Sequence, residues 1–239
     1  MWNENVLFII SCYKVSFISL SLCFLLELLS WNEYWNEKIQ SNKRLQELYL
    51  EALKMNYIHE LITGPILYGL SLLYISSYEE EKQLNYLYST PLLLLTQNLG
   101  YAYIHNWMHK PVNHWIHTYH HLYNKNTFVR PIVAHAVSHS EFMIAYAGPI
   151  MFGVFIFKPE KQALFITASS ISILNLLIHT PQEVFKTTEP FFHHIPDYVK
   201  NIFITNEKHF FHHEENPRSN YSAPLLDLDN ILMLNNKSK

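Results

Sequence analysis

The fold is decided by a histidine-rich stretch that reads His105-Asn-Trp-Met-His109, then Lys-Pro-Val-Asn-His114-Trp-Ile, then His117-Thr-Tyr-His120-His121. A side chain four positions on in a helix lies one turn above the first, so His105 and His109 can point at one ion. We expect His117, His120 and His121 to do the same through positions i, i+3 and i+4. These spacings predict metal-binding faces on a helix.

The same three-histidine spacing returns far downstream as His209-Phe-Phe-His212-His213. Neutral imidazole binds zinc, copper, iron and nickel, whereas calcium and magnesium prefer oxygen ligands. A single histidine is more often a surface or hydrogen-bonded residue than a ligand. One HxxxH followed by two HxxHH groups is a much more specific pattern. The sequence therefore predicts a transition-metal site.

The ordered set HxxxH, HxxHH and HxxHH resembles the fatty acid hydroxylase/sterol desaturase superfamily of membrane di-metal oxygenases. The resemblance covers roughly residues 90–232. Within it, Asn220-Tyr221-Ser222 is similar to the family's Asn-Tyr-Gly/Ala/Ser, and Asp229-Asn-Ile is similar to its Asp-Arg-Ile. The stretch from Ala134-His135 to Glu141 resembles the plant wax-synthesis (eceriferum-type) branch, and the sterol C4-methyl oxidase branch is the other close one.

The resemblance also implies a ligand set and a cofactor. Alignment with the family places His135 and His179 among the ligands, so the implied metal ligands are His105, His109, His117, His120, His121, His135, His179, His209, His212 and His213. It implies two iron ions, with zinc as the alternative in isolated protein. It further implies electrons from NAD(P)H through an external donor such as cytochrome b5, since the chain contains no GxGxxG nucleotide fingerprint.

The other histidines and two nearby carboxylates have more ordinary interpretations. His114 matches no ligand position of the family, so we expect it to pack or to lie at the surface. We interpret the remaining four as hydrogen-bonded or exposed, namely His59, His139, His193 and His194. Glu141 and Glu183 could orient ligand imidazoles, but solvated or helix-capping roles are favoured.

Apolar runs of membrane-spanning length cover residues 6–29, 61–77, 84–104, 142–157 and 162–178. A mean hydropathy of -0.03 does not distinguish a globular from a membrane protein, so the distribution decides. A cleavable signal peptide is the alternative for the first run, but the chain has Glu4 in place of a basic n-region. We therefore expect an all-α, polytopic membrane protein with four or five transmembrane helices and a helical, histidine-rich cap that holds a di-metal site.

We divide the chain into an N-terminal transmembrane and interfacial region (1–90), a fatty acid hydroxylase-like domain (91–232) and a polar tail (233–239). Residues 31–56 mix acidic with basic side chains, which is typical of a solvated or interfacial helix. A net charge of -3 without a basic cluster argues against a nucleic-acid partner. Cys12 and Cys23 both lie in the first apolar run, so the sequence predicts neither a disulfide framework nor a cysteine zinc site.

Charge also predicts the orientation of the chain in a membrane. If residues 31–56, 105–130 and 179–239 share one side, the opposite turns hold only Lys82, Lys158 and Lys161. The positive-inside rule then places the histidines on the cytoplasmic side or its organellar equivalent, with the N-terminus opposite. Residues 1–30 lack the arginines of a mitochondrial transit peptide. We expect the endoplasmic reticulum membrane, with the mitochondrial inner membrane as the alternative.

The predicted function is O2-dependent di-iron oxidation, by hydroxylation or desaturation, of a membrane lipid such as a sterol or a fatty acyl chain. The alternative is a catalytically silent member that serves as a structural subunit of a larger membrane complex. Small size, the polar segment 31–56 and two departures from the family pattern favour this alternative: Asn98 stands where the family often has Asp, seven positions before the first ligand, and Asn106 stands where it often has Arg, directly after that ligand. A Gly expected shortly after Asp229 is also missing. The complete histidine set favours the enzyme.

Overall fold

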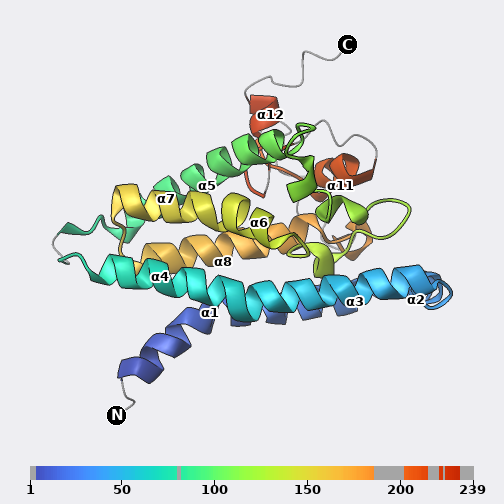
Figure 1. Ribbon diagram of the computed structural model, residues 1–239, viewed down its shortest axis with the longest axis horizontal. Coiled ribbons are helices and arrows are strands. Elements are labelled where there is room, and N and C mark those ends of the chain that lie inside the picture. Colours follow the sequence, from blue (N-terminus) through green and yellow to red (C-terminus); the bar gives the residue numbers. More distant parts are fainter. Residues whose placement is uncertain (1–3, 80–81, 186–201, 215–220, 223, 232–239) are drawn as a thin grey trace.

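The computed structural model describes residues 4–79, 82–185, 202–214, 221–222 and 224–231, and helices dominate it (Figure 1). The longer helices are α1 (Glu4–Ser30), α2 (Glu33–Gln40), α3 (Lys43–Ile58), α4 (Gly64–Ser76), α5 (Tyr86–Met108), α7 (Gly148–Phe157), α8 (Lys161–Ile178) and α11 (Asn206–Glu214). Short elements are α6 (His139–Glu141), α12 (Leu228–Ile231), the π-helices η1 (His59–Thr63) and η6 (Phe142–Ala147), and the 3-10 turns η3 (His114–Ile116), η4 (His120–Leu122), η5 (Pro131–Val133) and η7 (Gln182–Phe185). Within the described residues, β pairing is limited to two isolated bridges. The all-α prediction is confirmed.

The segments α3, η1 and α4 form one continuous helix from Lys43 to Ser76. It begins at Asn42, whose side-chain oxygen accepts hydrogen bonds from the backbone N–H of Arg44 and Leu45 at 3.0 and 3.3 Å. Its 34 residues span about 50 Å at 1.5 Å per residue, against about 30 Å for the hydrocarbon core of a bilayer. The polar first part therefore extends beyond the core, as expected of an interfacial helix.

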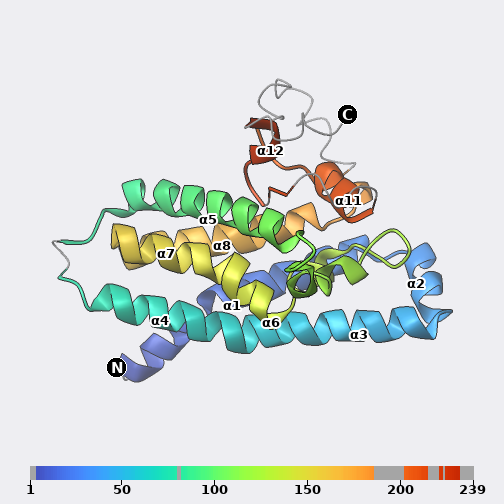
Figure 2. The same ribbon diagram turned by 45° about the horizontal axis from the view of Figure 1, so that its top comes forward.

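The bundle is built from two groups of helices that share α8. α1 packs against α4 and α8, while α5 packs against α7 and α8 (Figures 1 and 2). The contact of α5 with α7 requires glycine, because a Cβ on Gly100 would lie 2.7 Å from the Cβ of Pro149. Small residues of this kind allow membrane helices to approach closely.

Four helices are long and apolar enough to cross a membrane: Glu4–Ser30, Lys43–Ser76, His139–Phe157 and Lys161–Ile178. Helix α5, which the sequence analysis also expected as a span, is not among them, and its buried residues include the polar Gln97, Asn98 and His105. Large apolar side chains face outward on the spans, and Phe17 is 74% exposed. Four spans agree with the predicted four or five, so the chain is an integral membrane protein by composition and length.

A buried ion pair fixes α1 to the loop that precedes α6. The Arg130 side chain is fully buried, and its Nε donates to Glu27 Oε1 at 2.7 Å. Its Nη1 donates to the Ser30 carbonyl at 3.1 Å, and the Trp31 ring lies 4.9 Å from the guanidinium carbon. This pair explains how Glu27 is tolerated in the first apolar run.

The histidine motifs gather at one end of the bundle. Figures 1 and 2 show the N-terminus and the end of α7 at one end, with the loop 109–138 and α11 at the other. The predicted polar tail (233–239) lies outside the described residues.

Candidate metal centre

The first motif lies where α5 ends. His105 is in the last turn of α5 and His109 is its C-terminal cap, so the two rings lie on one face, with their Nε2 atoms 3.2 Å apart. Pro111 follows two positions after His109 and lacks the backbone N–H that would continue a helix. The chain therefore leaves the helix immediately after the first two histidines.

The second motif lies on two 3-10 turns and not on an α-helix, so the predicted helix through residues 117–121 is wrong. His117 caps η3, and His120 and His121 belong to η4. His117 Nε2 lies 2.8 Å from His105 Nε2, and His121 Nε2 lies 3.3 Å from His109 Nε2. His120 points elsewhere, with Nδ1 3.4 Å from the Ala136 carbonyl oxygen.

The third motif lies on α11. His209 and His213 share one helix face, with Nε2 atoms 3.2 Å apart. His209 Nε2 is also 3.0 Å from Nε2 of His179, the residue that caps α8. His212 faces the first motif instead, since its ring centroid lies 4.8 Å from that of His105.

Nine of the ten predicted histidines thus form two groups, and in each group one ring nitrogen from every histidine lies within 4.8 Å of those from the others. The five-histidine group comprises His105, His109, His117, His121 and His212, and the four-histidine group comprises His120, His179, His209 and His213. Nitrogens bound at about 2.1 Å to a common ion lie roughly 3–4 Å apart. Each HxxHH motif is divided between the groups, so the expectation that its three histidines point at one ion is wrong.

Hydrogen bonds on the outer side of the rings fix the tautomers. The Nδ1 atoms of His105, His179 and His213 lie 2.7, 2.8 and 2.9 Å from the backbone carbonyls of Tyr221, Asn175 and Tyr123, respectively. A carbonyl oxygen only accepts, so each Nδ1 carries the proton and each Nε2 presents a lone pair inward. His117 Nδ1 lies 2.6 Å from Glu141 Oε1, and an ionised carboxylate beside a bound cation accepts the Nδ1 proton in the same way.

Converging lone pairs fit a cation. His105 Nε2 and His117 Nε2 are both unprotonated by this argument, yet they lie 2.8 Å apart, where two lone pairs repel. The buried Nε2 of His120 has no hydrogen-bond partner among the described residues. A transition-metal ion in each group would satisfy these atoms, so the donor set fits the two metals that the resemblance implies.

Burial keeps the histidines neutral. It lowers the pKa of His109 and of His213 to about 4. It also lowers the pKa of His117, His120 and His209 well below the usual value, and the neighbouring histidines add to the effect. The rings are therefore neutral at ordinary pH and can act as ligands.

The structure does not bring His135 to either group. Its Nδ1 lies 2.7 Å from Glu60 Oε1, in the interior of the bundle. Glu60 is more than 70 residues away in sequence and no motif links the two, so sequence reasoning missed this pair.

Most of the remaining predictions for single residues can be compared with the structure. His114 is exposed, and His59 is buried with its ring stacked on Phe142 at 4.3 Å. Glu183 is exposed, whereas Glu141 is buried against His117, a role that the sequence analysis ranked second. His139 lies on α6 with its ring centroid 5.0 Å from that of His59. His193 and His194 lie outside the described residues, as does Asn220.

The Tyr221 and Asp229 motifs act together. Asp229 Oδ2 accepts hydrogen bonds from the backbone N–H and from the Oγ of Ser222, both at 2.8 Å. This fixes the backbone beside Tyr221, whose carbonyl orients His105. The two motifs therefore support the first ligand from outside.

The departure at Asn98 has a structural account. Its Oδ1 accepts from the backbone N–H of Leu225 and Leu226 at 3.2 and 3.0 Å, while its Nδ2 donates to the Leu94 carbonyl at 2.8 Å. An aspartate could not make the last bond. Asn106 is exposed. Neither asparagine contacts His105 through a hydrogen bond, so its orientation depends on Tyr221 instead.

The comparisons agree with this geometry. The family model described as fatty acid hydroxylase matches residues 90–232, more than half of the chain. Comparisons with curated proteins and with solved structures gave no match. The matched range contains all nine grouped histidines together with Glu141 and Asp229. The chain therefore belongs to the fatty acid hydroxylase family, as its ordered histidine motifs predicted.

Proposed function

We propose that the protein is a di-iron enzyme that hydroxylates or desaturates a membrane lipid with O2. The observation that carries this proposal is the pair of adjoining histidine groups with inward-facing Nε2 atoms. Lipid hydroxylation or desaturation is the chemistry that the family suggests. Two iron ions held there would supply the redox chemistry for attack on an unactivated C–H bond. Zinc is the alternative metal in isolated protein.

The residues of the chain contribute orientation and a dry environment. Backbone carbonyls and Glu141 fix the tautomers of the ligand histidines, and this outer support tunes metal affinity. The groups are largely buried, which keeps water away from the reacting atoms. The chain supplies no nucleotide-binding motif, so we assign electron delivery to an external carrier such as cytochrome b5 with NAD(P)H.

We further propose the membrane and the sidedness. The polar end that carries the histidines faces the cytoplasm from the endoplasmic reticulum membrane, with the mitochondrial inner membrane as the alternative. Residues 91–232 form the catalytic domain, and residues 1–90 supply two spans that support it.

A structural subunit of a larger membrane complex is the second candidate. Large apolar side chains that are exposed outside the candidate spans support this second role, because such surfaces are typical of protein–protein contacts. Val112 is 83% exposed and Trp115 is 68% exposed. Such a protein would keep the metal sites without turnover.

The deciding experiment combines metal analysis with lipid profiles. Purified protein should contain two iron ions per chain. Cells that carry His120→Ala or His212→Ala, one ligand from each group, should lose the oxidised lipid at matched protein abundance, while the exposed His114→Ala should behave as wild type. Unchanged lipid profiles, together with loss of a larger complex on deletion, would establish the structural role instead.

A further inference from the structure

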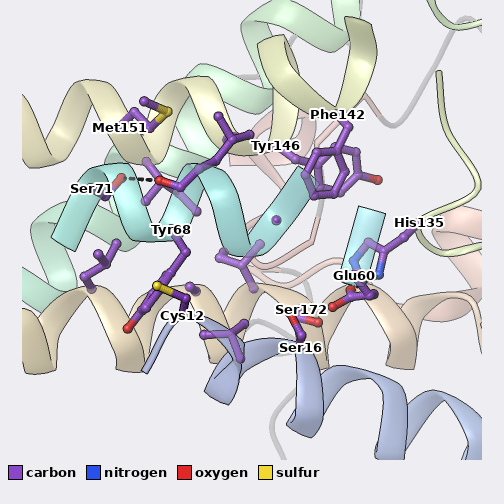
Figure 3. A pocket seen from close by; sticks show the side chains of 18 residues that line it. Cys12, Ser16, Glu60, Tyr68, Ser71, His135, Phe142, Tyr146, Met151 and Ser172 are labelled. Carbon is purple, nitrogen blue, oxygen red and sulfur yellow. Dashed lines mark hydrogen bonds and ion pairs between the residues drawn. The ribbon is translucent and has the colours of Figure 1, made fainter. Parts of the chain in front are cut away.

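A mainly apolar cavity of about 110 Å3 lies inside the bundle, and none of the nine grouped histidines is among its described lining residues. Figure 3 shows that side chains from α1, α4, α7 and α8 surround it, among them Cys12, Tyr68, Met151 and Ser172. The cavity is not fully enclosed by protein, and several lining residues are only half-buried. The helices around it belong to candidate membrane spans, so a lipid is the class of ligand that fits such a cavity.

Two irregular helix segments border this cavity. The π-helix η1 contributes Glu60, and the π-helix η6 contributes Phe142 and Tyr146. Each π segment is followed by a Gly-Pro pair, Gly64-Pro65 in one case and Gly148-Pro149 in the other. Proline lacks the backbone N–H of a regular turn, which accounts for the local widening. Single π turns inside helices frequently occur at functional sites.

The inner end of the cavity is polar. Glu60 Oε1 accepts a hydrogen bond from Ser19 Oγ at 2.7 Å and lies 2.7 Å from His135 Nδ1. Ser172 Oγ donates to Ser19 Oγ at 2.7 Å. Glu60 and His135 are 6% and 4% exposed, and Glu60 belongs to a candidate membrane span. Ionisable residues inside a membrane commonly mark a substrate path.

Glu60 and His135 line the cavity, and each retains an atom that no described residue contacts through a hydrogen bond. No hydrogen bond or ion pair of the described residues involves Glu60 Oε2 or His135 Nε2. His135 Nδ1 makes no well-aligned hydrogen bond within the described residues, but it lies 2.7 Å from an oxygen of Glu60. An unprotonated Nδ1 would be repelled by a carboxylate at that distance, so Nδ1 carries the proton and Nε2 is left as an acceptor. A ligand here must therefore donate a hydrogen bond. Carboxylates and phosphodiesters have no proton to donate, and an ionised Glu60 would repel them.

The polar end is also close to the four-histidine group. The Ala134 carbonyl accepts from Asn175 Nδ2 at 2.8 Å, and the Ala136 carbonyl lies 3.4 Å from His120 Nδ1. His135 stands between these two residues, so a single stretch of backbone separates the cavity from a ligand histidine.

We propose that this cavity binds the hydroxyl end of a membrane lipid, with Glu60 and His135 as the acceptors of its hydroxyl proton. Sites for whole small molecules have volumes of about 300–1,000 Å3, so this cavity takes the polar end and its first carbon atoms. The apolar remainder lies between the helices and the bilayer. This inference rests on the proposed function, because it takes the bound alcohol to be the class of substrate that the enzyme oxidises.

The test is equilibrium binding to the full-length protein in nanodiscs. Zinc-loaded protein is used because zinc does not undergo redox chemistry, so binding is measured without turnover. A radiolabelled long-chain alcohol is compared with its methyl ether and with the fatty acid of the same length, at equal mole fractions in the lipid. A sterol and its methyl ether form a parallel arm that distinguishes the two sources of a hydroxyl.

The alcohol, the sterol or both should bind at least about tenfold more tightly than the matching methyl ether, and the fatty acid should bind most weakly. Glu60→Met should abolish the preference for the alcohol. Ser71→Ala is the matched control, since Ser71 lines the same cavity but bonds its own helix at the Leu67 carbonyl.

Equal binding of alcohol and ether by wild-type protein would overturn the proposal, even if Glu60→Met does not fold. Tighter binding of the fatty acid would overturn it as well. Failure of this site leaves the metal content and the lipid profiles untouched, so the proposed function is judged separately.

Discussion

The division of neighbouring histidines between two groups can be tested by two matched double substitutions. The same-group variant, His120→Ala with His213→Ala, removes two ligands from the four-histidine group and none from the five-histidine group. The cross-group variant, His120→Ala with His121→Ala, removes two residues that are neighbours in sequence, one ligand from each group. Both variants lose two imidazoles, so any difference in metal content reflects the grouping alone.

The expected magnitude follows from the number of ligands. Structural zinc sites with four ligands have apparent binding free energies of about 10–16 kcal/mol at pH 7, so one ligand contributes roughly 3 kcal/mol. This is about a hundredfold in affinity, and two ligands of one group contribute about ten-thousandfold. The same-group variant should therefore hold one ion in its intact five-histidine group. The cross-group variant should bind metal about a hundredfold more weakly at both histidine groups.

The assay is elemental analysis at a free metal concentration buffered about tenfold above the wild-type dissociation constant. Wild type should hold two ions, the same-group variant one, and the cross-group variant close to none. Circular dichroism and gel filtration should show that both variants are folded. The reverse order, with one ion in the cross-group variant and none in the same-group variant, would mean that each HxxHH motif binds its own ion.

Three further predictions concern stability and affinity. Arg130→Met leaves Glu27 buried without an ionic partner, although Tyr49 and the Ile132 backbone still donate hydrogen bonds to it. The substitution should lower the free energy of unfolding by about 3–5 kcal/mol in denaturant titrations. Lys43→Met, at an exposed ion pair, should lower it by less than about 1 kcal/mol, and equal losses would refute this account. Glu141→Gln should weaken metal binding by the five-histidine group about 10- to 100-fold and leave metal binding by the four-histidine group unchanged. Equal weakening at both groups would count against the role of Glu141 in orienting His117. Burial lowers the pKa of His109 and of His213 from 6.5 to about 4, so the unfolded chain binds more protons between these pH values. The metal-free protein should therefore lose stability as pH falls from 6.5 towards 4, and equal melting temperatures at both ends would contradict this.

The identity of the grouped histidines could be predicted, but their distribution could not. Positions i and i+4 share a face in helices and in the tight turns seen here, so the pairs His105 with His109 and His209 with His213 follow directly from spacing. The direction of the residue between, His120 or His212, depends on where Pro111 ends α5 and on how α11 docks. Both are tertiary properties that spacing does not encode.

Partners that are distant in sequence could not be predicted for the same reason. The pairing of Arg130 with Glu27 and of His135 with Glu60 joins residues more than 70 positions apart. The alignment placed His135 among the metal ligands, and no spacing in the sequence pointed to Glu60 as its partner. The π segments were also missed, although the two Gly-Pro pairs within apolar runs were a signal for them.

The adjacency of His120 to His121, and of His212 to His213, has a consequence for metal loading. At both places a single peptide bond joins a ligand of one ion to a ligand of the other. The first ion to bind orders backbone that the second would otherwise have to order, at about 1–2 kcal/mol per residue. Loading should therefore be mildly cooperative, and a limited iron supply should yield fewer half-loaded chains than two independent sites would. A low iron supply would then reduce mainly the number of fully loaded molecules.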